Sequence, residues 1–159
     1  MEARWTDAIQ QEWSRNLLAA LPNLSDGRLK ETQRLMDKAL PQARVSGYER
    51  LIDDINLPDP DDRHIVAAGV AGGASVILTW NLRDFPAPEL QRHGLTARTP
   101  DAFLSNLHNI APALMTASLS NARRNLGQSG LSASDFIAVL KVQKLVQLAD
   151  RLRNHLADL

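Results

Sequence analysis

Residues 57–68, LPDPDDRHIVAA, and residues 76–86, VILTWNLRDFP, are the two stretches that decide the fold. In the first, two prolines interrupt the chain, and Asp61 and Asp62 suit the cap and first turn of a helix. That helix would continue through apolar residues to a pair of glycines, which suit its C-terminal end. Residues 74–79 are apolar and partly β-branched, which indicates a buried parallel strand. A helix followed by such a strand predicts an α/β fold.

Further helices and strands are predicted on both sides of these two stretches. A short helix at 89–93 and a second or edge strand at 95–97 would follow the first strand, so helix and strand alternate. Before it, residues 6–20, with Thr6 or Asp7 as N-cap, and residues 26–40, capped by Ser25 or Asp26, have helical spacing and predict a helical hairpin. Helical spacing returns at 48–55. These elements predict a short parallel sheet within a helical frame.

From residue 99 onward every pattern is helical. Residues 113–126 predict one helix, and residues 132–159 predict a long last helix with Ser132 and Asp135 placed as a capping box. The glycine-containing segment 127–130 between them resembles a linker. We therefore predict an α/β core over residues 1–105 and a helical extension over residues 106–159, packed on the core or on a partner.

The last predicted helix has a broad apolar side, more than a helix in solvent needs. Its neighbour within the chain would be the helix at 113–126. Its apolar residues are Val139, Val142, Leu145, Val146, Leu148, Ala149, Leu152 and Leu156.

Composition limits the classes of function. The chain has 159 residues, of which 44% are hydrophobic and 23% charged, which is typical of a globular protein with a core. Lysine plus arginine and aspartate plus glutamate both total 18, so no overall positive field would attract nucleic acid. The absence of cysteine excludes disulfides and thiolate metal sites and fits a reducing compartment. The longest apolar stretch is short and broken by glycines, so we expect a cytoplasmic protein without a membrane span.

Acidic side chains are concentrated at the start of one predicted helix and at the end of the strand that follows it. Asp59, Asp61 and Asp62 open one helix, and Asn81 and Asp84 follow the carboxyl end of the next strand, where α/β folds usually bind ligands. Aspartates crowded together need a cation or protonation, and oxygen ligands without cysteine favour Mg²⁺ or Mn²⁺. Such a site predicts hydrolysis of a phosphodiester. Helix capping and turn formation are the simpler explanation for each residue taken alone.

The order and spacing of the two quoted stretches resemble the second half of a PIN domain of the VapC type. In those ribonuclease toxins an aspartate opens a helix reading Asp-x-x-Ile-Ala-Ala, and the next strand ends in a Thr-x-Asn-x-x-Asp-Phe pattern. Asp62, Asn81 and Asp84 fall on those positions. Residues 4–17 also resemble the second-helix region of the family, whose acidic ligand would fall on Glu12. The resemblance covers roughly residues 4–105, and a helical C-terminal extension is similar to one subgroup of the family.

This resemblance implies a PIN-like three-layer fold and a magnesium-dependent endoribonuclease, the toxin of a type II toxin-antitoxin system. It implies Glu12, Asp62 and Asp84 as catalytic residues and metal ligands, with Asn81 orienting a ligand or a water and Asp61 beside the metal. The cofactor would be Mg²⁺ or Mn²⁺. The partners would be an RNA substrate, an antitoxin and a second copy of the chain.

The chain departs from the family pattern at its start. The family begins with a buried strand that ends in an aspartate, and here both are missing. Three explanations are open: the start shown is internal, the neighbouring strands close directly on each other, or another copy supplies a strand. The loss also favours an alternative function, a catalytically degenerate PIN scaffold that binds an antitoxin or itself.

Other polar and aromatic residues near the acids have weaker signals. Arg63 and His64 both lie beside the aspartates. His64 would contact phosphate or base, although a first-turn histidine more often packs or faces solvent. Trp5, Trp13 and Trp80 are predicted to pack in the core rather than stack on bases.

Overall fold

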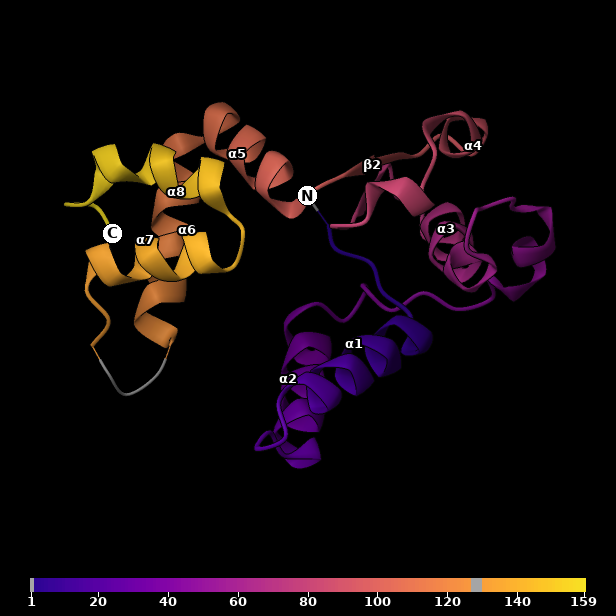
Figure 1. The fold of residues 1–159 in the computed structure, drawn as a ribbon, viewed down its shortest axis with the longest axis horizontal. Coiled ribbons are helices and arrows are strands. Elements are labelled where there is room, and N and C mark those ends of the chain that lie inside the picture. The colour runs from indigo at the N-terminus through magenta and orange to yellow at the C-terminus, as the bar shows by residue number, and fades with distance from the viewer. Residues whose placement is uncertain (1, 127–129) are drawn as a thin grey trace. The chain divides into compact units, whose positions relative to one another are not determined.

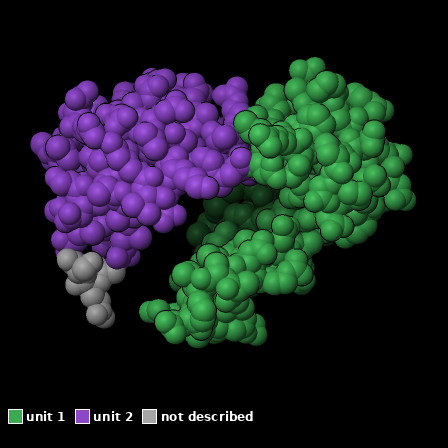
Figure 2. All heavy atoms as spheres, in the orientation of Figure 1, with its two compact units in different colours: residues 1–77, 81–97 green, residues 78–80, 98–159 purple. Residues whose placement is uncertain are grey.

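The computed structural model describes residues 2–126 and 130–159 of a mostly helical α/β chain (Figure 1). Two compact units divide it, one of residues 1–77 and 81–97 and the other of residues 78–80 and 98–159 (Figure 2). In the first unit the helical elements are α1 (Asp7–Ala20), α2 (Asp26–Ala39), α3 (Arg63–Ala71), α4 (Ala87–Arg92) and the 3₁₀ helices η1 (Glu49–Asp54), η2 (Pro60–Asp62) and η3 (Leu82–Asp84). In the second unit they are α5 (Pro100–Ile110), α6 (Pro112–Asn125), α7 (Ala133–Val142), α8 (Val146–Leu152) and η4 (Arg153–His155).

The predicted helical hairpin at the start of the chain is confirmed. The Thr6 side chain accepts a hydrogen bond from the Ile9 amide and caps α1, and Ser25 caps α2 in the same way. The Gln33 side chain on α2 donates to the Ser14 hydroxyl on α1 at 2.7 Å. The two helices are therefore joined by polar contacts as well as by packing.

Two short strands, β1 (Val76–Leu78) and β2 (Thr96–Arg98), form the sheet and flank α4 in the sequence. Thr96 N donates to Ser75 O, and Thr79 N donates to Arg98 O. Since both positions advance together along the chain, the strands are parallel. The predicted α/β class and short parallel sheet are confirmed at this coarse level. The segment 48–55, predicted as helical, contains the 3₁₀ helix η1 (Glu49–Asp54), flanked by its cap residues Tyr48 and Ile55.

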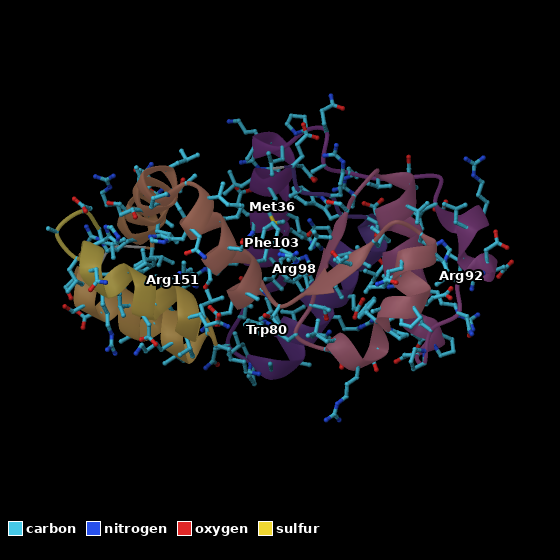
Figure 3. The ribbon with its side chains drawn as sticks, turned by 90° about the horizontal axis from the view of Figure 1, so that it is seen from above. Met36, Trp80, Arg92, Arg98, Phe103 and Arg151 are labelled. Atoms are coloured by element: carbon cyan, nitrogen blue, oxygen red, sulfur yellow. The ribbon has the colours of Figure 1, made fainter. Side chains whose placement is uncertain are left out.

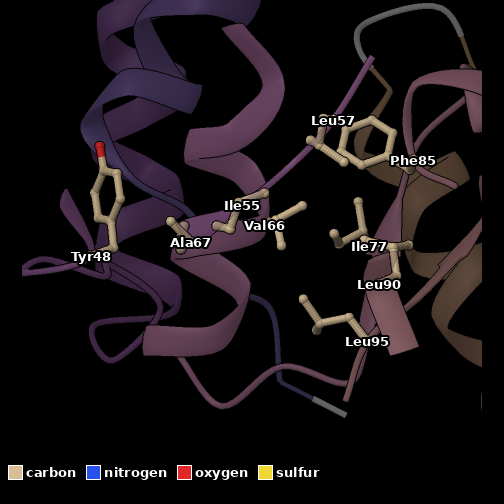
Figure 4. Close-up of a cluster of buried hydrophobic side chains, with 10 residues drawn as sticks. Tyr48, Ile55, Leu57, Val66, Ala67, Ile77, Phe85, Leu90 and Leu95 are labelled. Carbon is tan, nitrogen blue, oxygen red and sulfur yellow. The ribbon is translucent and has the colours of Figure 1, made fainter. Parts of the chain in front are cut away.

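The core of the first unit lies between α3 and β1 (Figure 4). Val66 and Ala67 on α3 are fully buried, and Ile77 on β1 is buried with them. The remaining large members of the cluster come from the segments on either side: Tyr48, Ile55, Leu57, Phe85, Leu90 and Leu95. This packing fixes the start of α3 and the end of β1, where the acidic residues lie.

The predicted end of α3 at the glycine pair is confirmed. Gly73 has a φ of 64°, the left-handed conformation that glycine adopts at low cost. Its amide donates to Val70 O, and the Ala74 amide donates to Gly69 O. Together these bonds close a Schellman motif.

The second unit has its own hydrophobic core, built by α7 and α8 with residues of α5 and α6. Leu148, Ala149 and Leu152 on α8 are fully buried. Leu104 on α5 and Leu119 on α6 pack against the same cluster. The helix α8 packs mainly on α5 and α7, so its main neighbours differ from the predicted one, the helix at 113–126.

The prediction of one continuous helix over residues 132–159 is wrong. The chain leaves α7 after Val142 and turns at Lys144, whose φ of 63° is left-handed. Lys144 N donates to Lys141 O and Leu145 N to Leu140 O, the same Schellman pattern as at Gly73 but without a glycine. Of the predicted apolar side, Leu148, Ala149 and Leu152 are buried and Leu145 is half-buried, whereas Val139, Val142, Val146 and Leu156 are exposed.

Replacing Lys144 by glycine is expected to stabilise the second unit. A left-handed non-glycine residue costs roughly 1 to 2 kcal/mol, of which glycine would recover about 0.5 to 1 kcal/mol after its greater loss of chain entropy. Urea denaturation measures the change. Gln143→Gly is the matched control, because Gln143 has an ordinary φ of −79° and glycine there should lower stability. Equal effects of the two substitutions would contradict the argument.

Two further sequence predictions concern single segments. Most of the linker-like segment 127–130, namely residues 127–129, lies outside the described residues. Among the helices of residues 2–126 and 130–159, none is both long and apolar enough to cross a bilayer.

Candidate functional site

Asp62 stands at the junction of η2 and α3. The 3₁₀ turn before it is capped by Asp59, whose side chain accepts a hydrogen bond from the Asp61 amide at 2.9 Å. The predicted positions are confirmed, since Asp62 is the N-cap residue of α3 and Asp61 lies with it in the first turn of η2. The Asp62 side chain, however, makes no capping hydrogen bond. The Asp62 carboxylate is thus left available for another role.

Acidic side chains from separate segments act on Asp62. Its pKa is raised above the ordinary value, first by burial and then by the negative charges of Asp59, Asp84 and Glu12, while His64 opposes the rise. Glu12 comes from α1 and Asp84 from the turn after β1, so the fold brings together residues that lie 72 positions apart. Close approach of carboxylates is the condition under which one of them resists ionisation.

Glu12 also has a basic neighbour. The Nε2 atom of His64, in the first turn of α3, lies 3.5 Å from the Glu12 carboxylate. His64 is half-buried, and its Nδ1 atom is buried without a hydrogen-bond partner among the described residues. The Nε atom of the adjacent Arg63 is likewise buried and unpaired there. The pairing therefore ties α1 to the start of α3 at the acidic cluster.

Asn81 and Asp84 are joined directly. The Asn81 side-chain amide donates a short hydrogen bond to the Asp84 carboxylate across η3. The next residue, Phe85, is buried in the core, which anchors this turn. Asn81 therefore orients the Asp84 carboxylate.

Asp61 and Trp80 are both exposed to solvent. Asp61 is not among the groups that shift the pKa of Asp62. Trp80, labelled in Figure 3, is 47% exposed, so the prediction that it packs in the core is wrong. Trp5, by contrast, is buried, and its indole N–H donates to Asp37.

The donor set around Asp62 fits a hard divalent cation in its chemistry. Carboxylate oxygens are the ligands that Mg²⁺ and Mn²⁺ prefer. Within residues 2–126 and 130–159, no three histidine, aspartate or glutamate side chains already stand together as a ligand group. Mg²⁺ commonly binds through one or two carboxylates and keeps several waters, so Asp62 with one neighbour would suffice. Which residues are metal ligands stays a prediction.

Comparisons with known proteins place the chain beside VapC-type proteins. The model of the family described as the VapC50 C-terminal domain matches residues 100–154. The putative ribonuclease VapC50 of Mycobacterium tuberculosis (strain ATCC 25618 / H37Rv) is 42% identical over 65 residues. That match covers 41% of this chain and 38% of the relative. No solved structure matches the chain.

These matches confirm the predicted resemblance for part of the chain, which is a partial homologue of VapC-type proteins. The family match falls within the second unit and leaves out Glu12, Asp62 and Asp84. The family model therefore matches most of the predicted helical extension and a few residues before it. The three-layer arrangement, the domain boundary at 105/106 and the roles of the acidic residues stay predictions.

Proposed function

We propose that the chain is a metal-dependent endoribonuclease, the toxin component of a type II toxin-antitoxin system, with its acidic cluster in the first unit. The observation that carries the proposal is that the charges of Asp59, Asp84 and Glu12, from separate segments, all raise the pKa of Asp62. These carboxylates come from α1, the turn before α3 and the turn after β1. The similar protein of Mycobacterium tuberculosis is named a putative ribonuclease, which supports the same reaction class.

Each residue of the cluster has a role in this proposal. Asp62 and Asp84 would hold Mg²⁺ or Mn²⁺, with Glu12 as a further ligand, directly or through water, and Asp61 at the rim. Asn81 would keep the Asp84 carboxylate turned toward the ion through the hydrogen bond described above. His64, paired with Glu12, would hold that carboxylate in place. The bound ion would supply an activated water and neutralise charge on the phosphodiester.

The partners follow from the same proposal. The net formal charge of the chain is zero, so RNA would be recognised locally rather than by a general positive field. An antitoxin would be the protein partner, and the site of action would be the cytoplasm.

The experiment that tests the proposal compares the chain with its Asp62→Asn variant. Mn²⁺ binding is measured by calorimetry, and cleavage of a mixed RNA pool is measured with and without the metal. Metal-dependent cleavage that needs Asp62 is the expected result. The absence of both binding and cleavage in the unaltered chain would overturn the proposal.

A second candidate function is a protein-binding scaffold that associates with an antitoxin or with itself. It is favoured by large aliphatic side chains exposed on the second unit, among them Val142 (78%), Ile110 (71%) and Leu114 (71%). Exposed aliphatic side chains of this size are candidates for an interface.

Self-association is tested by sedimentation velocity over a range of concentrations. We expect dimers whose dissociation constant rises about tenfold or more when Val142 is replaced by glutamate, because a buried charge weakens an apolar interface. Ala138→Glu, at an exposed but small residue of the same helix, is the comparison. A chain that stays monomeric at all concentrations would contradict self-association.

A further inference from the structure

Glu89 in the first turn of α4 has no part in the site described above, yet it is a buried acid with three partners. Its side chain is 9% exposed. One oxygen, Oε1, accepts a hydrogen bond from the backbone N–H of Asn56 at 2.9 Å and lies 3.3 Å from His93 Nε2. The other, Oε2, accepts from Arg92 Nη1 at 2.8 Å. Arg92, labelled in Figure 3, and His93 both come from the end of the same helix.

The partner that matters for the site is Asn56. Asn56 is the first residue after the C-cap of η1, and only two residues, Leu57 and Pro58, separate it from Asp59. On either side of it, Ile55 and Leu57 are buried in the core of the unit. The Glu89 bond thus falls between two buried anchors, on the segment that leads into the aspartates.

Charge makes this bond stronger than an ordinary one. Hydrogen bonds that end on an ionised carboxylate are shorter and roughly twice as strong as neutral ones. The pKa of Glu89 is lowered first by the Asn56 bond and, after an opposing effect of burial, by His93 and Arg92. Glu89 is therefore ionised at neutral pH, and its two oxygens are held in fixed directions.

We propose that Glu89 is a positioning residue for the candidate metal site, because its hydrogen bond to the backbone N–H of Asn56 fixes the segment that carries Asp59 and Asp62. The inference rests on the proposed function and extends it to a residue outside the acidic cluster. Ile55 and Leu57 bury the segment, but apolar contacts are not directional, and the bond between them fixes its rotation. A shift of about 1 Å in such a segment is enough to spoil a metal site.

The test uses a pair of substitutions at Glu89. Glu89→Leu keeps apolar bulk and helix propensity but removes both acceptors, whereas Glu89→Gln keeps one side-chain oxygen for the Asn56 amide. Glu49→Leu is the matched control, since Glu49 is an exposed first-turn residue of η1. Thermal unfolding of all variants shows whether the fold is retained.

Two readouts separate positioning from general stability. In the Glu89→Leu chain, hydrogen exchange over residues 55–62 is expected to be about tenfold faster, while exchange in α1 and α2 is unchanged. Mn²⁺ affinity is expected to fall about 10- to 100-fold, as for other residues that orient metal ligands. The Glu89→Gln chain should keep most of the slow exchange over residues 55–62 and most of the Mn²⁺ affinity. Glu49→Leu should change neither the exchange nor the affinity.

The outcomes distinguish this inference from the proposed function. Unchanged exchange over residues 55–62 in the Glu89→Leu chain overturns the positioning role. Faster exchange with unaltered Mn²⁺ affinity also overturns it, provided that the unaltered chain binds Mn²⁺ through Asp62. If the unaltered chain binds no Mn²⁺, the positioning role fails because there is no metal site to position, and the proposed function fails as well if that chain also cleaves no RNA.

Discussion

Replacing Asp101 by alanine is expected to destabilise the second unit by about 3 kcal/mol, because it strips the cap from a helix at the centre of that unit. Asp101 lies in the first turn of α5 and is only 6% exposed. Its two oxygens accept hydrogen bonds from the Gln147 and Leu148 amides, each at 3.0 Å. Both amides belong to the first turn of α8, whose own N-cap residue provides no side-chain bond.

The size of the effect follows from what the substitution leaves behind. Two amides of a helix that buries Leu148, Ala149 and Leu152 would lose their partner, and each buried unpaired amide costs roughly 1 to 3 kcal/mol. Urea denaturation followed by circular dichroism measures the loss. Asp101→Asn keeps one acceptor oxygen and should lose about half as much.

Asp135→Ala is the control for the Asp101 prediction. Asp135 is also an acidic first-turn residue of this unit, but it is exposed and its side chain bonds the Ser132 hydroxyl. Its loss should cost about 1 kcal/mol or less. If Asp101→Ala costs no more than Asp135→Ala, the bonds to α8 contribute little and apolar packing alone holds that helix.

Local sequence patterns predicted the elements that depend on local chemistry. The caps at Thr6 and Ser25 and the turn at Gly72 and Gly73 are each set by residues within one helical turn. The parallel sheet also followed from local patterns, because a short apolar strand after a helix has few other solutions. The contact between Glu12 and the α3 segment came instead from family resemblance.

The failures have two physical causes. The break at Lys144 carries no glycine or proline, so nothing in the sequence marks a left-handed residue there. The pattern predicts a strand up to residue 79 and core packing for Trp80 just after it, but β1 ends at Leu78 and Trp80 lies beyond its ladder. In each case the element ended earlier than its apolar pattern.

The contacts that sequence reasoning missed are separated by long stretches of chain. Asp101 bonds amides 46 and 47 positions later, and Glu89 bonds an amide 33 positions earlier. Each acid also fits the first turn of its own helix, which is a sufficient local explanation. Only the fold shows that these carboxylates cap or hold other segments.

Replacing Asp62 by asparagine is expected to lower metal-dependent RNA cleavage by about 100-fold or more, a larger loss than for a residue that only orients a ligand. The substitution keeps the shape of the side chain and removes its charge. Because the fold raises the pKa of Asp62, the ionised form is disfavoured in the folded state. At neutral pH the variant should therefore be as stable as the unaltered chain or more so, with a gain below about 0.5 kcal/mol after solvent screening.

Because cleavage should fall while stability stays equal or rises, the experiment separates loss of function from loss of fold. A variant that melts no lower than the unaltered chain yet neither binds Mn²⁺ nor cleaves RNA has lost a ligand, not a structure. Asp54→Asn, an exposed aspartate of η1, is the matched control and should behave like the unaltered chain. The Asp61→Asn variant tests whether Asp61 binds the ion. A loss of cleavage as large as that of Asp62→Asn would make Asp61 a metal ligand, and a small loss would leave it at the rim of the site. If Asp62→Asn instead lowers stability and leaves cleavage unchanged, the acidic cluster holds the fold together and the chemistry lies elsewhere.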